Sequence, residues 1–488
     1  MKKFLPIAAL ATLVICTIVR IYFICTTMVI DDESYYYVWT NHLAWGYIDG
    51  GPTIAFINKL FVMLFGVNGF SVRIGGVLLV TIASIYLYYW GTKRYSQLVG
   101  FLLLLLLSIT PACFVSSIIH TYDTEMVVFM LAAIALYYDA YFVDKRFFYP
   151  AGAALGLAML SKISVLFPAI GILIFSFVHK PMREHLRKKE FYLSFLIAAL
   201  IFLPFIVWNF THDFAFIRFK GGMAYRHGGL GDFINVWTAQ LPLYLPTLCW
   251  YAIGVPIGIM ISWLRRKRVP SDDLYFALIA IIPILYFGIG SYFSRYYGNW
   301  VAPVFFSGLL LMPICLSRNW KSGRVTLGVH LALSVVMLMA IVGQVYLDFL
   351  PIHGDGDITN RYYQYSAIPE ELKPYLDKHP ELQKIRIVGN NYQIPSMVNM
   401  YVRPKIEAAG LSLGDYHKTL YTMLYPGKAF ANKPLLLLNE GEEFPKEFRP
   451  YFSTVEKKQT FISRRHGEEV GRFTLWYVTG YRGRSEKT

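Results

Sequence analysis

The sequence predicts a polytopic α-helical membrane protein that ends in a soluble mixed α/β domain. Hydrophobic residues make up 56% of its 488 residues and charged residues only 16%, with a mean hydropathy of +0.44, whereas soluble domains are less apolar and more charged. From Phe4 to about Phe349 apolar runs of roughly 16 to 30 residues alternate with short polar loops, which is the length that spans a bilayer. From about Pro351 charges recur every few residues. We therefore expect a membrane domain over residues 1–350 and a soluble domain over 351–488.

About eleven helices are expected to cross the membrane. The first runs from Phe4 to about Ile30, and Arg20 together with the lack of a small-residue cleavage site favours an uncleaved helix over a signal peptide. The segment 147–178 would be about 48 Å long as one helix. Because basic loops flank it on both sides, two shorter segments that turn near Ser161-Lys162 fit better than one tilted helix. That turn would lie near the outer surface.

Lysine and arginine concentrate in every second loop, as they do in cytoplasmic loops of membrane proteins. The pattern predicts a cytoplasmic N-terminus and external positions for the Asp32 loop, residues 209–232, the Arg295 loop and the whole C-terminal domain. It also explains much of the formal net charge of +15 without a nucleic-acid partner. The basic residues concerned are Lys2, Lys3, Lys93, Arg94, Lys145, Arg146, Lys180, Arg183, Arg187, Lys188, Lys189, Arg265, Arg266, Lys267, Arg268, Arg318, Lys321 and Arg324.

The cysteines and the missing motifs exclude several classes of site. All five cysteines lie in or beside apolar runs, which favours packing over disulfides or a metal centre. The sequence contains no CxxC pair, no P-loop and no dinucleotide fingerprint.

The C-terminal part has the pattern of alternating helices and short strands. Pro369-Glu370-Glu371 after Ser366 indicates a helix start, Ile385 to Val388 and Leu435 to Leu438 are expected as buried strands, and Phe473 to Val478 as a closing strand. No catalytic constellation is visible in this part. We expect it to cover a site, to help recognise an acceptor, or only to stabilise the protein.

The loop after the first apolar run is the most informative segment. It opens with Asp31-Asp32-Glu33 and reaches Asp49. Carboxylates are costly in hydrocarbon, so their cluster at a membrane surface favours a functional site. An aromatic belt with solvated charges is the alternative explanation.

A short helix is expected within this loop. Ser34 to Trp45 contains no helix breaker and spaces Tyr35, Trp39 and His42 along one face, which is typical of a helix lying in the membrane interface. Gly46 would end it, and Gly50-Gly51-Pro52 would redirect the chain.

Five segments in order carry a specific resemblance. They are Asp32-Glu33-Ser34-Tyr35-Tyr36 with His42 to Asp49, then Thr121 to Thr124, Gly156 to Lys162, Pro204 to Asn209, and Tyr297 to Pro303. This series resembles the GT-C glycosyltransferases related to protein O-mannosyltransferases and to the aminoarabinose transferases of lipid A. Asn390 to Gln393 and Met400-Tyr401 are similar to the tail of the same bacterial branch. One departure is Gly50-Gly51-Pro52, where relatives usually have two prolines, often preceded by His or Lys, so a side chain for the lipid phosphate is missing.

The resemblance implies an inverting transfer of a sugar from a polyprenyl-phosphate donor to a lipid, glycan or protein acceptor on the outer side of a bacterial inner membrane. Phosphate needs no proton to leave, but it needs positive charge to stabilise the departing anion. The external cations are Lys162, Arg218, Lys220, Arg226, His227 and Arg295. Contact with membrane lipid headgroups explains each of them equally well when taken singly.

The resemblance also implies roles for the acidic residues. Asp32 aligns with the family's acidic residue at the end of the first helix and is the candidate general base for an acceptor hydroxyl. Asp123 would orient the acceptor or share that role, with a charge favoured by a helix N-terminus as the alternative. Glu33 and Asp49 are candidate substrate contacts and candidate ligands of a divalent metal ion. His42 and His120 are weighed as ligands too, although plain hydrogen bonding is the simpler interpretation.

Tyr36 and Asn299 complete the expected substrate-binding residues, because both lie in the matching segments. A transporter or flippase of a lipid-linked substrate is the alternative function; such proteins place charges in broken helices at the midplane and contain internal repeats, neither of which is seen here. A noncatalytic scaffold is favoured less. Convergence of Asp32 and Asp123 beside one external cavity would favour the enzyme. The sugar and the acceptor stay open.

Overall fold

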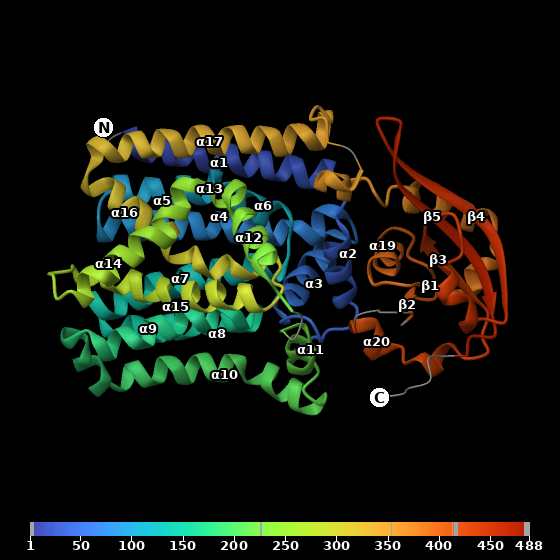
Figure 1. The fold of residues 1–488 in the computed structure, drawn as a ribbon, viewed down its shortest axis with the longest axis horizontal. Coiled ribbons are helices and arrows are strands. Elements are labelled where there is room, and N and C mark those ends of the chain that lie inside the picture. Colours follow the sequence, from blue (N-terminus) through green and yellow to red (C-terminus); the bar gives the residue numbers. More distant parts are fainter. Residues whose placement is uncertain (1–3, 225–226, 353, 412, 414–417, 483–488) are drawn as a thin grey trace. The chain divides into compact units, whose positions relative to one another are not determined.

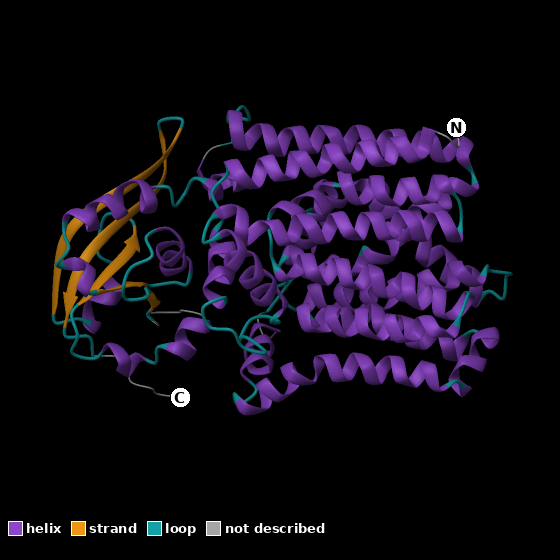
Figure 2. Cartoon of the chain, turned by 180° about the vertical axis from the view of Figure 1, so that it is seen from behind, coloured by secondary structure: helices purple, strands orange, loops and turns teal. Residues whose placement is uncertain are grey.

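The computed structural model describes residues 4–224, 227–352, 354–411, 413 and 418–482. The chain divides into two compact units. The first comprises residues 1–23, 50–54 and 74–339, and the second comprises 24–49, 55–73 and 340–488. The helical first unit and the strands of the second are distinguished by colour in Figure 2. The second unit thus includes the acidic loop that follows the first helix.

Long helices form the first unit and are labelled in Figure 1. Three of these helices, α1, α4 and α17, continue into the second unit, as does the short α3. The bounds of the helices in the first unit, including the four that continue beyond it, are α1 (Phe4–Thr26), α3 (Thr53–Phe65), α4 (Gly69–Arg94), α5 (Gln97–Ile109), α6 (Pro111–Ile118), α7 (Tyr122–Phe142), α8 (Phe148–Ser161), α9 (Leu166–Val178), α10 (Lys189–Thr211), α11 (Ala215–Ala224), α12 (Leu230–Thr238), α13 (Gln240–Cys249), α14 (Val255–Leu264), α15 (Ser271–Phe293), α16 (Phe306–Arg318) and α17 (Trp320–Leu347).

Seven helices of the described chain are long and apolar enough to cross a membrane, and up to ten if each of three bent pairs counts as one span. The bent pairs are α5 with α6 (59°), Ile163–Val178 with Lys180–Arg187 (100°), and Gly298–Val304 with α16 (48°). The polytopic membrane fold is therefore confirmed. The number of about eleven crossings stays a prediction.

The chain turns back at Lys162, as predicted. Lys162 has extended backbone angles (φ −155°, ψ 127°) and ends α8. The ring of Tyr141 lies 5.3 Å from that of Phe148, at the start of α8, and 5.3 Å from that of Phe175, near the end of α9. The two helices therefore form a hairpin, with the lysine in its turn.

The basic loops that were predicted to be cytoplasmic share one end of the helical unit. Arg94 binds Asp139 near the end of α7 (Nε to Oδ1, 2.6 Å), and Arg318 binds Asp273 at the start of α15 (Nη1 to Oδ1, 2.6 Å). The Tyr95 hydroxyl donates a hydrogen bond to Asp272 Oδ2 at 3.4 Å, and His179 Nε2 lies 2.8 Å from Ser271 Oγ. These contacts connect further loops to the same end. Asp123 lies in the first turn of α7, about 24 Å along the helix from Asp139.

The second unit is built on a five-stranded sheet with the order β2-β1-β3-β5-β4. The strands are β1 (Arg386–Gly389), β2 (Ala409–Gly410), β3 (Leu435–Glu440), β4 (Thr454–Arg465) and β5 (Glu468–Thr479). β1 pairs in parallel with β2 and β3, whereas β3–β5 and β5–β4 are antiparallel. The three predicted strands are confirmed. The four leucines of β3 are all buried, as expected for an apolar run in a strand that is covered on both faces. The helix predicted after Ser366 is present as Ile368–Leu372 followed by α18 (Lys373–Lys378).

The predicted interfacial helix was wrong in its bounds and in its surroundings. Helix α2 (Asp31–Trp39) begins earlier and ends before His42, and Glu33 to Trp39 are all buried. It packs against α19 (Gln393–Tyr401) within the second unit. The Tyr47 hydroxyl donates to the carbonyls of Trp39 and His42, and its ring stacks on Trp39 at 3.8 Å. The loop after the helix thus folds back onto its last turn.

Candidate active site

Asp32 is held between two residues of the C-terminal part, all three in the second unit. Its Oδ2 accepts a hydrogen bond from Arg361 Nη2 at 2.8 Å, and its Oδ1 accepts one from the Tyr392 hydroxyl at 2.9 Å. The side chain of Asp32 stays 33% exposed. Because a carboxylate has about four acceptor positions, lone pairs remain for a substrate hydroxyl.

Asp31 shares the same guanidinium but is more enclosed. Arg361 donates to its Oδ1 from Nε at 3.1 Å and also from Nη2, and the Asp31 side chain is 13% exposed. Burial, and then the neighbouring charge of Asp32, raise the pKa of Asp31 against the opposing effect of Arg361. Asp32 is therefore the more accessible carboxylate of the pair.

Tyr392 is kept as a hydrogen-bond donor. Burial, followed by the charges of Asp32 and Asp31, raises the pKa of its phenol well above the usual value. Its ring lies 4.7 Å from that of Tyr35 on α2, and Tyr35 in turn accepts from the Leu420 amide at 2.8 Å. These contacts fix the donor beside Asp32.

Glu33 does not fit the expected metal ligand. Arg73 binds it through Nε (2.8 and 2.9 Å) and Nη2 (2.6 Å), and both side chains have no exposed surface. Glu33 also accepts from the Ile30 amide at 3.0 Å, at the start of α2. A guanidinium thus occupies the position where a cation would bind, and within the described residues no three His, Cys, Asp or Glu side chains gather as a metal site. We derive no step through a metal.

A second polar cluster joins three predicted residues in the first unit. Lys162 Nζ lies 2.5 Å from Asp123 Oδ1, and Asn299 Nδ2 donates to Asp123 Oδ2 at 2.8 Å. Asn299 comes from the short helix Gly298–Val304, Lys162 from the α8–α9 turn and Asp123 from the start of α7. The side chains of Lys162 and Asp123 are 13% and 18% exposed. Residues far apart in sequence thus form one partly open charged site.

Gly51 explains the departure from the family pattern. A Cβ at this position would lie 1.7 Å from the carbonyl oxygen of Leu160 and 2.7 Å from that of Ser161. Thr53 Oγ1 also donates to Ser161 Oγ at 3.0 Å. Any side chain at Gly51 would collide with the backbone just before Lys162, so the glycine lets this loop pack against the lysine-bearing turn.

Two of the other predicted cations, Arg295 and Arg218, are exposed to solvent. Arg295 is 69% exposed and lies 3.8 Å from Asp232, and Arg218 is exposed on α11. Lys220 Nζ lies 5.5 Å from the ring centroid of Trp300, the neighbour of Asn299. Arg226 lies outside the described residues, and the backbone of His227 pairs with Ser294.

The remaining candidates have structural surroundings. Tyr36 is buried on α2 and meets Trp39 edge-on at 5.0 Å. Asp49 is half-buried, and its charge contributes to the raised pKa of Tyr392. His42 Nε2 pairs with Glu407 at 2.8 Å, and His120 Nε2 lies 3.0 Å from Glu125 in a buried pair. Both histidines therefore have a carboxylate partner.

Sequence reasoning missed Arg361 and Tyr392 and expected no catalytic constellation in the C-terminal part. Tyr392 stood in a matching segment without a role, and Arg361 had no signal. The expected convergence of Asp32 with Asp123 stays a prediction, because the two residues belong to different units.

Comparisons with known proteins show similarity to membrane glycosyltransferases. Residues 49–208 match the family described as dolichyl-phosphate-mannose-protein mannosyltransferase. The lipid A galacturonosyltransferase RgtD of Rhizobium johnstonii is 24% identical over 354 residues, 70% of this chain and 71% of the relative. ArnT of Cupriavidus metallidurans, solved with undecaprenyl phosphate and in the apo state, has a TM-score of 0.65 in both states at 13% and 12% identity, with 96% of this chain and 97% of that chain covered.

At such low identity the ArnT structures establish the fold, while the family match and the curated relative establish the kind of enzyme. They agree with the ordered motifs of the sequence. The chain is thus a multi-span membrane enzyme that is similar to glycosyltransferases of the GT-C superfamily in its motifs and its family match, and to ArnT in its fold.

Proposed function

We propose that this glycosyltransferase moves a sugar from a polyprenyl-phosphate donor to an acceptor of the bacterial envelope, with inversion at the anomeric carbon. The observation that carries the proposal is the meeting of Asp123, Lys162 and Asn299 in one partly open cluster of the helical unit. ArnT, which shares this fold, was solved bound to undecaprenyl phosphate. A lipid phosphate needs a cation near the membrane surface, and this cluster supplies one.

Lys162 is the proposed contact of the leaving phosphate. An ammonium has three donors, and Asp123 engages one of them, so two remain for phosphate oxygens. Asp123 positions the lysine, and Asn299 fixes Asp123 from its other oxygen. Lys220, which lies over the Trp300 ring, and the exposed Arg295 are further positive charges on neighbouring elements.

Asp32 is the proposed general base. As the acceptor oxygen attacks the anomeric carbon, its proton passes to Asp32, and the bond from that carbon to the donor phosphate oxygen breaks. Arg361 and Tyr392 hold the carboxylate in place and leave acceptor positions open.

The proposed orientation has the N-terminus inside, the residues beyond 350 outside, and both polar clusters on the outer side. The common end of the basic loops supports this orientation, because positively charged loops stay in the cytoplasm. We further propose residues 1–350 as the membrane domain and 351–488 as an extracytoplasmic domain that contributes Arg361 and Tyr392.

An envelope lipid is the proposed acceptor, since the curated relative is named a lipid A galacturonosyltransferase. The test is mass spectrometry of envelope lipids from a deletion strain and from the same strain carrying the gene. A lipid that lacks one sugar mass in the deletion strain, and regains it on complementation, is the expected result. Unchanged lipids together with a lost protein glycan would contradict the acceptor class, and no lost sugar at all would contradict the transferase role.

A further inference from the structure

The C-terminal part contains a pocket that lies apart from Asp32 in sequence and that the proposed chemistry does not use. Its volume is about 330 Å³, within the range of about 300 to 1,000 Å³ typical of small-molecule sites. Its lining comes from the start of β1 and the two residues before it, from the start of β3 and from the segment between the two strands: Lys384, Ile385, Arg386, Ile406, Tyr425, Ala429, Phe430, Lys433, Pro434 and Leu435. Every lining residue belongs to the second unit.

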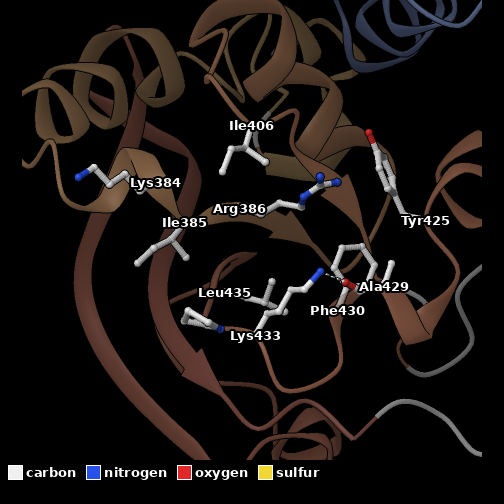
Figure 3. Close-up of a pocket in the computed structure, with 10 residues that line it drawn as sticks. Lys384, Ile385, Arg386, Ile406, Tyr425, Ala429, Phe430, Lys433 and Leu435 are labelled. Carbon is white, nitrogen blue, oxygen red and sulfur yellow. Dashed lines mark hydrogen bonds between the residues drawn. The ribbon is translucent and has the colours of Figure 1, made fainter.

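The charge of this lining is entirely positive. It contains three cations and no carboxylate. Figure 3 shows the ends of Arg386 and Lys433 directed into the space near Tyr425 and Phe430, whereas the Lys384 ammonium points away from them. Lys433 Nζ donates to the carbonyl of Ala429 at 3.0 Å, which leaves two ammonium protons. Nη1 of Arg386 is buried and has no hydrogen-bond partner among the described residues.

The walls of the pocket are aromatic and aliphatic. The Arg386 guanidinium lies 4.4 Å from the centre of the Tyr425 ring, a stacking contact that holds it in one orientation. Phe430 and the aliphatic side chains of Ile406 and Leu435 supply the rest. A bare inorganic anion uses only the cations, whereas a sugar ring that carries an anionic group also covers the apolar wall.

The pocket is linked to the loop that follows α2. Tyr425 donates to Glu407 Oε2 at 2.5 Å, and Glu407 binds His42 at 2.8 Å. Burial, and then Glu407, raise the pKa of Tyr425 to about 12, so its hydroxyl remains a donor. Burial opposes the ionisation of Glu407, but His42 and Tyr425 outweigh it and lower the pKa of the carboxyl. Glu407 thus stays a charged link between the pocket wall and the segment three residues beyond α2.

We propose that this pocket binds the acidic group of a sugar, a phosphate or carboxylate carried on the ring, with Arg386 and Lys433 as its ligands and Tyr425 and Phe430 against the ring. The site would recognise an acidic sugar of the acceptor and hold it on the unit that carries Asp32. The assignment of that sugar to the acceptor rests on the proposed function. The binding site itself does not.

The test is equilibrium dialysis of radiolabelled glucose 6-phosphate against the full-length protein in detergent. Glucuronate, inorganic phosphate and methyl glucoside are the competitors. Glucose 6-phosphate should bind, glucuronate should compete, and inorganic phosphate and methyl glucoside should compete at least fivefold more weakly. Equal competition by inorganic phosphate would overturn the role of the ring, and equal competition by methyl glucoside would overturn the role of the charge.

Variants locate the site. Lys433→Gln and Arg386→Gln should each weaken glucose 6-phosphate binding by about five- to tenfold, as expected for charge-assisted hydrogen bonds at a partly exposed site. Lys446→Gln removes the same charge from an exposed lysine outside the lining and should leave binding unchanged. Lys433 is exposed, so Lys433→Gln should fold. The test therefore remains valid even if Arg386→Gln fails to fold.

Unchanged binding in Lys433→Gln, or an equal loss in Lys446→Gln, would overturn the proposal. Polyprenyl phosphate binding is measured on the same samples and should be the same in all of these variants. If the wild-type protein does not bind polyprenyl phosphate at all, the result counts against the proposed transferase function. Failure of the pocket proposal and failure of the proposed function are therefore distinguishable.

Discussion

The replacement Asp32→Asn tests the proposed mechanism most directly. Asparagine keeps the shape of the side chain: its oxygen can still accept from Arg361, and its amide nitrogen can donate to the Tyr392 hydroxyl, but it cannot take a proton at neutral pH. The two hydrogen bonds at 2.8 and 2.9 Å should therefore persist in weaker form. The protein should fold and reach the membrane.

The expected sizes of the two effects differ enough to be separated. Loss of a general base costs about 10² to 10⁴ in rate, or roughly 3 to 5 kcal/mol of transition-state stabilisation. Exchanging a charged acceptor for a neutral one weakens each hydrogen bond by about 1 kcal/mol at most, and the one-third exposure of Asp32 reduces that further. Transfer should fall by orders of magnitude with little change in stability.

The assay is complementation of the deletion strain, read by mass spectrometry of envelope lipids, with donor binding measured on purified protein. The matched control is Asp31→Asn, which removes the same charge from the adjacent residue on the same arginine. Because Asp31 is more enclosed and its pKa is raised by burial and by Asp32, its neutral form should be tolerated and transfer should stay within about tenfold of wild type.

Near-normal lipid modification by Asp32→Asn, at equal protein levels, would remove Asp32 from the mechanism. That result would be compatible with the same family if the acceptor nucleophile is itself a phosphate, which needs no base. Equal losses in Asp31→Asn and Asp32→Asn would show that the pair acts through Arg361 as a structural unit.

Three further outcomes are expected. Reporter fusions should place residue 185 in the cytoplasm and 355–488 outside, because the basic loops share one end of the bundle; a cytoplasmic C-terminal part would contradict this orientation. Lys162→Gln should weaken binding of polyprenyl phosphate by about 1.5 to 3 kcal/mol and leave binding of the uncharged polyprenol unchanged; equal losses for both lipids would assign the lysine to structure. Arg73→Leu should cost about 3 to 5 kcal/mol because it leaves buried Glu33 unpaired, and replacing both residues by Leu should recover much of that loss in thermal unfolding; no recovery would contradict the pairing argument.

Local patterns explain why much of the architecture was predictable from sequence. Spanning helices follow from apolar runs of sufficient length, and the turn at Lys162 followed from two basic loops that must lie on the same side. The strand at Leu435 to Leu438 is an apolar run too short to be a helix of its own, and it was recognised for that reason. Asp123, Lys162 and Asn299 were singled out one by one through the motifs that contain them.

The contacts between distant site residues could be learned only from the tertiary structure. No periodicity relates Asp32 to Arg361 and Tyr392, which are 329 and 360 residues away, because a hydrogen bond between distant segments leaves no local signal. The role of Glu33 was equally hard to predict from the sequence. Its place in an acidic run suggested a metal ligand, whereas its buried contact with Arg73 shows that it forms an ion pair.

The sequence by itself determined the membrane fold, the alternation of basic and acidic loops and the resemblance to glycosyltransferases, since hydropathy, loop charge and ordered motifs are properties of neighbouring residues. The tertiary structure decided that α2 is buried against α19, and which residues surround the candidate base. It also decided why Gly51 replaces a side chain, since the carbonyl of Leu160 occupies that space. Such choices depend on atoms that meet only after the chain has folded, and for that reason composition and spacing do not contain them.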